Sequence, residues 1–159
     1  MTVKAVSKRG SKAGSVSAAA RSATAPCVAA IGASAGGYEA IRAFFQAMPA
    51  DSGIAFVIVQ HLDPSHASLA AELFAKCTAM PVREATDGVL LEADHVYTSP
   101  SDQDMVVRGG RLHLTARPDT RRPRLPIDRL FASLGEDRGA RAIGIVLSGS
   151  GSEDRKSVV

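Results

Sequence analysis

One serine occupies a position whose neighbours favour nucleophilic chemistry. Ser34 is the central residue of Gly32-Ala33-Ser34-Ala35-Gly36, which fits the pattern G-x-S-x-G. Small neighbours in this pattern allow a serine to sit on a sharp turn between a strand and a helix, with its hydroxyl exposed and backbone N–H groups nearby. The pattern therefore predicts that Ser34 is a nucleophile.

This glycine-rich turn has two other interpretations. A dinucleotide-binding turn has the pattern G-x-G-x-x-G, with an acidic residue at the end of the following strand. Here Ser34 stands where the second glycine would be, and the next strand ends in Gln60-His61. A dinucleotide site is therefore disfavoured, whereas a glycine turn without chemistry remains an alternative.

A histidine follows the second predicted strand. Apolar residues predict a strand over 27–31, helical spacing predicts a helix over 38–48, and a second apolar run predicts a strand over 54–59. A strand-helix-strand unit produces neighbouring parallel strands, and functional residues gather at the carboxyl ends of such strands. We therefore expect Ser34 and His61 to lie within reach of each other, with His61 as the general base and His66 as a weaker candidate.

An acidic loop follows a third apolar strand. Residues 142–147 predict a buried strand, and the glycine-rich run 148–154 after it contains Glu153 and Asp154. An acid that orients the histidine would belong in this loop. The order serine, histidine, acid along the chain disfavours a lipase-like α/β-hydrolase, whose order is serine, acid, histidine.

The remaining segments complete the predicted fold. Helices are expected over 67–76 and 127–134, and strands over 95–99 and 105–115, with a hairpin turn at Gly109-Gly110. We assign 95–115 to an antiparallel insertion, in which His95 and His113 are strand residues without chemistry. The predicted fold class is α/β, a doubly wound and mainly parallel sheet with an antiparallel hairpin insertion.

Composition and charge limit the kinds of partner. The chain has 159 residues, enough for one domain, and residues 1–26 contain five basic residues and no acid. The whole chain carries a net charge of +3, so residues 27–159 carry −2. We expect residues 1–26 to form a disordered basic tail, and we expect no nucleic-acid partner because the folded part lacks a basic surface.

Cysteine content and hydropathy bear on the cellular setting. Cys27 and Cys77 are the two cysteines, and they form no CxxC motif. The sequence shows no apolar run as long as a membrane span and no signal core. A cytoplasmic protein without membrane insertion, metal or cofactor is the expectation.

Several strings, taken together and in order, resemble the CheB-type chemotaxis protein-glutamate methylesterase family. They are IGASAGG at 31–37, VIVQHLDP at 57–64, EATDG at 84–88, HVYTSP at 95–100, LPIDRLF at 125–131 and RAIGIVLSGSGS at 141–152. The resemblance covers roughly residues 27–152. This part of the chain specifically resembles the methylesterase part of CheB/CheR fusion proteins. Agreement of several long strings is far more specific than any single motif.

The resemblance implies a function and a set of site residues. It implies hydrolysis of glutamate γ-methyl esters on methylated chemotaxis receptors, with deamidation of glutamine as a further activity that the sequence leaves open. Carried over residue by residue, Ser34 is the nucleophile, His61 is the general base, and Glu153 holds the position of the family's orienting aspartate, with Asp154 as the alternative. Backbone N–H groups near Ala35 and Ser150 would meet the developing oxyanion.

The chain departs from the family pattern at both ends. After Ser152 the pattern has Asp-Gly and then a closing helix and strand, whereas this sequence has Glu153-Asp154 and five further residues. Residues 1–26 are too few for a receiver domain. We therefore expect residues 27–159 to form a C-terminally incomplete methylesterase domain, and a catalytically dead receptor-binding or scaffold form is the alternative function.

Overall fold

The structure, a computed structural model, describes residues 25–33, 37–60, 69–116 and 125–147. Its centre is a five-stranded sheet with the strand order β3-β5-β2-β1-β8. All neighbouring strands in this sheet are parallel. The strands are β1 (Cys27–Ala33), β2 (Ile54–Gln60), β3 (Val82–Glu84), β5 (Val96–Thr98) and β8 (Ala142–Leu147).

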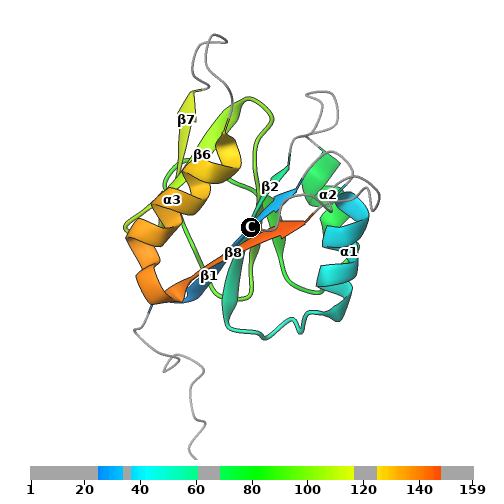
Figure 1. Ribbon diagram of the computed structural model, residues 1–159. Helices are drawn as coiled ribbons and strands as arrows, with labels where there is room; N and C mark the ends of the chain where they lie inside the picture. The colour runs from blue at the N-terminus through cyan, green and yellow to red at the C-terminus, as the bar shows by residue number, and fades with distance from the viewer. Residues whose placement is uncertain (1–24, 34–36, 61–68, 117–124, 148–159) are drawn as a thin grey trace, which may run out of the picture.

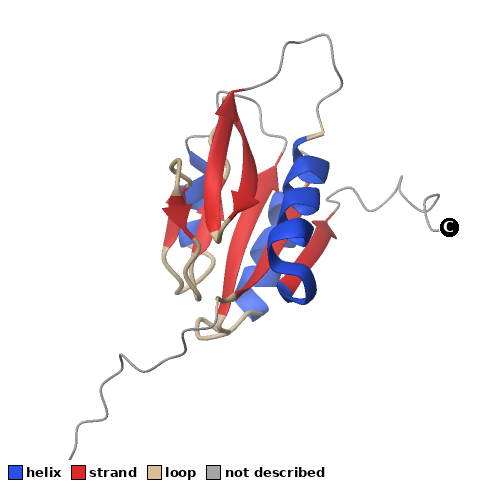
Figure 2. Ribbon diagram, turned by 90° about the vertical axis from the view of Figure 1, so that its left-hand side faces the viewer, coloured by secondary structure: helices blue, strands red, loops and turns tan. Residues whose placement is uncertain are grey.

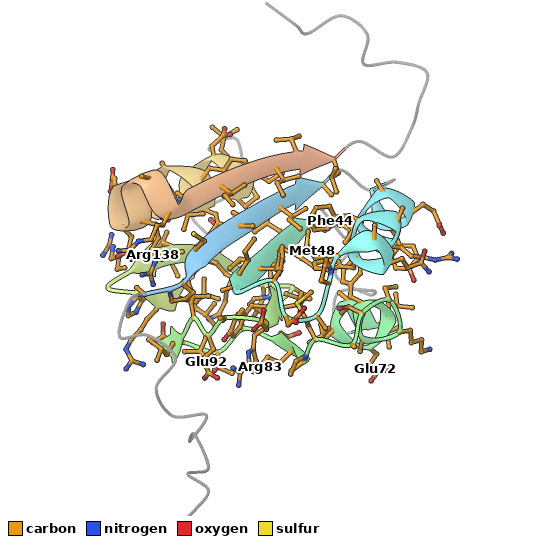
Figure 3. All side chains as sticks on the ribbon, turned by 90° about the horizontal axis from the view of Figure 1, so that it is seen from below. Phe44, Met48, Glu72, Arg83, Glu92 and Arg138 are labelled. Carbon is orange, nitrogen blue, oxygen red and sulfur yellow. The ribbon has the colours of Figure 1, made fainter. Side chains whose placement is uncertain are left out.

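Two helices cover one face of the parallel sheet (Figure 1). They are α1 (Tyr38–Ala47) and α2 (Ala70–Ala75). Their apolar residues pack on alternate residues of the strands, and Phe56 is central because its ring lies 5.4 Å from that of Phe45 and 6.0 Å from that of Phe44. Figure 3 shows Phe44 and Met48 between α1 and the sheet, as their packing against this core requires.

A helix and a small antiparallel sheet cover the other face. The helix is α3 (Pro126–Arg138), followed by a short 3₁₀ turn (Gly139–Arg141). The strands are β4 (Val89–Leu90), β6 (Gln103–Arg108) and β7 (Arg111–Ala116), in the order β4-β7-β6. Figure 2 sets this hairpin and α3 in front of the parallel sheet. Helices on both faces of a parallel sheet form the doubly wound arrangement that the sequence predicts.

Hydrogen bonds hold α3 against the antiparallel hairpin. The hydroxyl of Ser133 accepts from the backbone N–H of Val107 at 3.0 Å, and Arg129 donates to the carboxylate of Asp104 at 2.8 Å. Asp137 accepts from the backbone N–H of Gly110, which lies in the hairpin turn with a positive φ of 75°. The hairpin and α3 therefore form one layer.

The predicted fold class is confirmed, and one assignment within it is wrong. Residues 95–99 were assigned to the antiparallel insertion, but β5 pairs in parallel with both β2 and β3. The insertion therefore contains β6 and β7, together with the two-residue β4, which the sequence did not predict. Three-residue strands such as β3 and β5 are too short to show the periodicity that identifies a strand.

The helix predictions differ from the structure mainly at their ends. Among the described residues, α1 and α2 end one residue earlier than predicted, and α3 extends four residues further, to Arg138. The tail prediction for residues 1–24 lies outside the described residues. Ala25, which was assigned to that tail, accepts a hydrogen bond from Arg141 at 3.2 Å.

Candidate active site

Three adjacent strands of the parallel sheet end at the same level. In the register of the sheet, Ala33 of β1 is paired with Gln60 of β2 on one side and with Leu147 of β8 on the other. Neighbouring strands lie about 4.8 Å apart. The chain segments that follow β1, β2 and β8 therefore leave the sheet from one short row.

The predicted site residues follow these three strands. Ser34 and Ala35 come directly after β1, His61 comes directly after β2, and Ser150, Glu153 and Asp154 come after β8. His66 belongs to the segment after β2. All of them lie outside the described residues, so the arrangement of their side chains remains a prediction. The neighbouring, parallel placement of β1 and β2, on which that prediction rested, is confirmed.

Close contact with α3 fixes the positions of β1 and β8. A Cβ atom on Gly32 would lie 2.6 Å from Cγ2 of Ile127, and one on Gly144 would lie 3.2 Å from the ring of Phe131. A side chain at position 32 would therefore push α3 away from the sheet. Glycine at position 32 allows α3 to pack directly against the carboxyl end of β1, two residues before Ser34.

The start of α1 belongs to the same edge of the sheet. Gly37, the N-cap residue, is buried, and the ring of Tyr38 packs 5.5 Å from that of Phe74 of α2. Burial raises the pKa of Tyr38 above its ordinary value, and a hydrogen bond with Cys77 adds to the effect. The tyrosine is therefore neutral at physiological pH.

Two polar side chains at this edge were missed by sequence reasoning. The side-chain nitrogen Nε2 of Gln60 and the hydroxyl of Thr98 are buried, and neither has a hydrogen-bond partner in the structure as described. Thr98 is the last residue of β5 and is 2% exposed. A signal was available, because both are polar residues that end otherwise apolar strands.

The two histidines interpreted as structural lie away from this edge. His95 directly precedes β5, at the amino end of the parallel strands, and its ring stacks 6.3 Å from that of Tyr97. It is not a strand residue, contrary to the sequence prediction, whereas His113 does lie in β7. His113 has Nδ1 3.7 Å from a carboxylate oxygen of Asp87.

A network of hydrogen bonds surrounds the hydroxyl of Tyr97. This hydroxyl accepts from Arg83 and from the backbone N–H of Glu92, and donates to the carbonyl of Leu90. Figure 3 shows Arg83 and Glu92 close together at this surface. The hydrogen bond with Tyr97 is the main cause of the raised pKa of Arg83. The network joins β3, β4 and β5 and holds the short strands in place.

The described residues contain no group of three His, Cys, Asp or Glu side chains that could hold a metal ion. In the same part of the chain, no helix has the length and apolar character needed to cross a membrane.

Most of the chain matches a known protein family. Residues 29–158 match the model of the CheB methylesterase family. The chain belongs to this family. It is 39% identical over 134 residues to protein-glutamate methylesterase/protein-glutamine glutaminase 2 of Xanthomonas oryzae pv. oryzae (strain MAFF 311018). It is 38% identical over 128 residues to the protein-glutamate methylesterase/protein-glutamine glutaminase of Salmonella typhi.

The matches to these relatives cover different shares of each protein. The alignment with the Xanthomonas protein covers 82% of this chain and 37% of the relative, and that with the Salmonella protein covers 78% and 36%. The chain thus spans less than two fifths of the length of the CheB relatives that it matches.

A solved CheB structure has the same fold. The Thermotoga maritima CheB methylesterase catalytic domain superposes with a TM-score of 0.68 at 23% sequence identity. The superposition covers 80% of this chain and 70% of that domain. The parallel sheet and its helices are therefore those of a CheB methylesterase domain.

Proposed function

We propose that the chain is a serine hydrolase that removes methyl groups from glutamate γ-methyl esters on chemotaxis receptors. The observation that carries the proposal is the register row in which Ala33 pairs with Gln60 and Leu147. This row brings together the strand ends that precede Ser34, His61 and the acidic segment after β8. Membership of the CheB methylesterase family supports the reaction class.

The proposed reaction follows the chemistry of a serine nucleophile. The hydroxyl oxygen of Ser34 attacks the ester carbonyl while His61 accepts its proton. The tetrahedral intermediate collapses, and His61 returns the proton to the leaving methoxide, which departs as methanol. Water then attacks the acyl-enzyme with His61 again as base, and this step releases the glutamate carboxylate and restores Ser34.

Other groups orient the base and stabilise negative charge. Glu153, with Asp154 as the alternative, would hold the imidazole of His61 in the productive tautomer. The backbone N–H groups near Ala35 and Ser150 would donate to the oxyanion of the tetrahedral intermediate. Removing one such donor typically costs about 2.7–4 kcal/mol of transition-state stabilisation.

The proposed substrate is a methylated chemotaxis receptor. The relatives from Xanthomonas and Salmonella are named both as methylesterases and as glutaminases. Attack by Ser34 on a γ-carboxamide gives the same acyl-enzyme and releases ammonia instead of methanol. Deamidation of receptor glutamine is therefore a second reaction of the same proposed site.

A second candidate function is a receptor-binding form without turnover. One sequence feature favours it, because Glu153-Asp154 stands where the family pattern has Asp-Gly. A glutamate side chain is one methylene longer than an aspartate, and Asp154 is displaced by one position. Failure to orient the histidine costs about 10⁴ in kcat in a serine triad.

Methanol release from a methylated receptor fragment distinguishes the two functions. We expect release that Ser34→Ala and His61→Gln abolish. Matched controls are Ser52→Ala and His95→Gln. Ser52 lies two residues before β2 and His95 directly precedes β5, so both lie at the amino ends of the parallel strands. Binding of the receptor fragment without methanol release would instead favour the receptor-binding form.

A further inference from the structure

Three of the four strands that lie at a sheet edge among the described residues are protected against pairing with another chain. An edge strand presents unpaired backbone N–H and C=O groups, and proteins protect such edges with short strands, charged side chains or a covering element. The edge strand β3 has three residues, two of them charged, and β4 has only two residues. The edge strand β6 is covered by α3, whose Ser133 accepts from the backbone N–H of Val107.

The fourth edge strand, β8, has none of these protections. It has six residues, Ala142–Leu147, and none of them has a charged or polar side chain. In the described part of the chain, no strand pairs with its outer side. Figure 3 shows β8 as the outermost strand of the sheet, beyond β1. Val146 is 72% exposed and Ile143 is 39% exposed, so β8 presents both free backbone groups and apolar side chains.

The two exposed side chains of β8 lie on opposite faces of the sheet, because side chains alternate along a strand. Val146 shares a face with Gly144, which packs against Phe131 of α3. Ile143 shares the other face with Ile145, which packs against the core beneath α1 and α2. Strands that are buried on both faces have nearly continuous apolar sequences. A strand that pairs with β8 and covers both side chains must therefore be apolar on both faces.

Within this sequence, β8 itself has the required character, whereas the segments outside the described residues do not. None of these segments has more than two adjacent residues of the types Val, Ile, Leu, Met and Phe, and residues 148–157, which follow β8, contain none of these types. The other described strands already pair within the two sheets. A second copy of this chain, in contrast, supplies another β8, whose sequence AIGIVL is apolar on both faces.

We propose that two copies of this chain form a dimer in which their β8 strands pair in an antiparallel arrangement about a two-fold axis. A two-fold axis allows the same strand to serve as the contact surface on both copies. Antiparallel pairing is slightly more stable per residue than parallel pairing. The two parallel sheets then form one continuous sheet. The dimer is closed, because the pairing uses the β8 edge of both copies, and it does not depend on the proposed hydrolase function.

The test compares one substitution on β8 with a matched substitution elsewhere. Ile143→Lys places a charge on the exposed side of β8, and Leu73→Lys is the control. Both wild-type side chains are 39% exposed, and Leu73 lies on α2. The first measurement is sedimentation of the full chain at several concentrations, with circular dichroism to confirm that each variant is folded. The second measurement is backbone amide hydrogen exchange of the wild-type chain at low and high concentration.

We expect the wild-type chain to change from monomer to dimer as its concentration rises. Ile143→Lys should raise the dissociation constant of the dimer by about tenfold or more, because the charge enters the interface twice and a lysine on an edge strand opposes pairing. Leu73→Lys should leave the dissociation constant unchanged. Amide exchange in β8 should slow at high concentration, whereas exchange in the edge strands β3 and β6 should stay the same.

Four results would overturn the proposed dimer. They are a wild-type chain that sediments as a monomer at every concentration up to its solubility limit, assemblies that grow beyond the dimer, equal dissociation constants for folded Ile143→Lys and Leu73→Lys, and β8 exchange that does not depend on concentration. If Ile143→Lys does not fold, the exchange measurement on the wild-type chain decides the question by itself.

Discussion

Ala33 of β1 and Gln60 of β2 are partners in the last register position of two parallel strands. Each is followed directly by a candidate catalytic residue: Ser34 follows Ala33, and His61 follows Gln60. Leu147 of β8 lies on the other side of Ala33 and precedes the acidic segment. The sheet thus provides the common starting level that a serine, a histidine and an acid need in order to meet.

Gly32→Ala should destabilise the domain. The added Cβ would lie 2.6 Å from Cγ2 of Ile127, so either α3 or the end of β1 must shift. Overpacking of this kind costs about 1–3 kcal/mol in the free energy of unfolding, measurable by urea denaturation. Gly135→Ala is the control, because nothing lies within 4 Å of its added Cβ on α3. It should stabilise by about 0.5–1 kcal/mol, and equal effects of the two variants would contradict the packing described for Gly32.

Tyr97→Phe should weaken the attachment of the short strands. The tyrosine is fully buried, and its hydroxyl makes three hydrogen bonds, including one of 3.1 Å from the N–H of Glu92 and one of 3.0 Å to the carbonyl of Leu90. Loss of these three part-buried hydrogen bonds should lower the free energy of unfolding by about 1–3 kcal/mol. Arg83→Gln should cost less than about 1 kcal/mol, because Arg83 is partly exposed. A larger loss in Arg83→Gln than in Tyr97→Phe would argue against this ranking.

Much of the fold could be predicted from the sequence, because the long apolar strands and the amphipathic helix α1 have clear periodicity. Residues 142–147 coincide with β8, and Gly109-Gly110 forms the predicted hairpin turn. β3, β4 and β5 were missed or assigned to the wrong sheet, since two or three residues carry no measurable period. Their positions depend on contacts with distant residues, such as the pairing of Val96 with Phe56.

The candidate site, like the fold, could be predicted from the sequence only in part. The sequence alone predicts that β1 and β2 are neighbours, because a short strand-helix-strand connection produces adjacent parallel strands. It could not predict the burial of Thr98 or of the side-chain nitrogen of Gln60, which depends on how β5 enters the sheet.

The stability of the domain should decrease at alkaline pH in a way that depends on Tyr38. Its pKa is raised above the ordinary value of 10.0, mainly by burial. As pH rises above about 10, the unfolded chain loses this proton first, so unfolding releases a proton and the free energy of unfolding falls. Below that range both the folded and the unfolded chain keep the proton, so Tyr38 does not lower the free energy of unfolding. Tyr38→Phe should make the decrease between pH 9 and 11 shallower, and an unchanged slope by urea denaturation would refute this assignment.

Val146→Lys should reduce self-association without loss of stability. β8 is an edge strand of the parallel sheet, and Val146 is 72% exposed. Exposed apolar edge strands pair with other chains, and a lysine on the edge opposes this. Leu125→Lys is the control, because Leu125 is 54% exposed but lies outside the sheet. Sedimentation at several concentrations should show less association for Val146→Lys than for Leu125→Lys, and equal association would exclude β8 as the contact surface.

The role of the acidic residues can be separated by single substitutions. If Glu153 orients His61, Glu153→Gln should lower kcat for methanol release by about 10⁴, as loss of the acid does in serine triads, and Asp154→Asn should have little effect. The reverse result would assign the role to Asp154. Equal, small effects of both substitutions would show that neither carboxylate orients the base.

The most direct test of the proposed hydrolase function is the rate of methanol release from a methylated receptor fragment, measured side by side for the wild-type chain, Ser34→Ala and Ser52→Ala. We expect release by the wild type and by Ser52→Ala, and loss of release in Ser34→Ala. Release that persists in Ser34→Ala, or no release by the wild-type chain, would contradict the assignment of Ser34 as the nucleophile of a methylesterase.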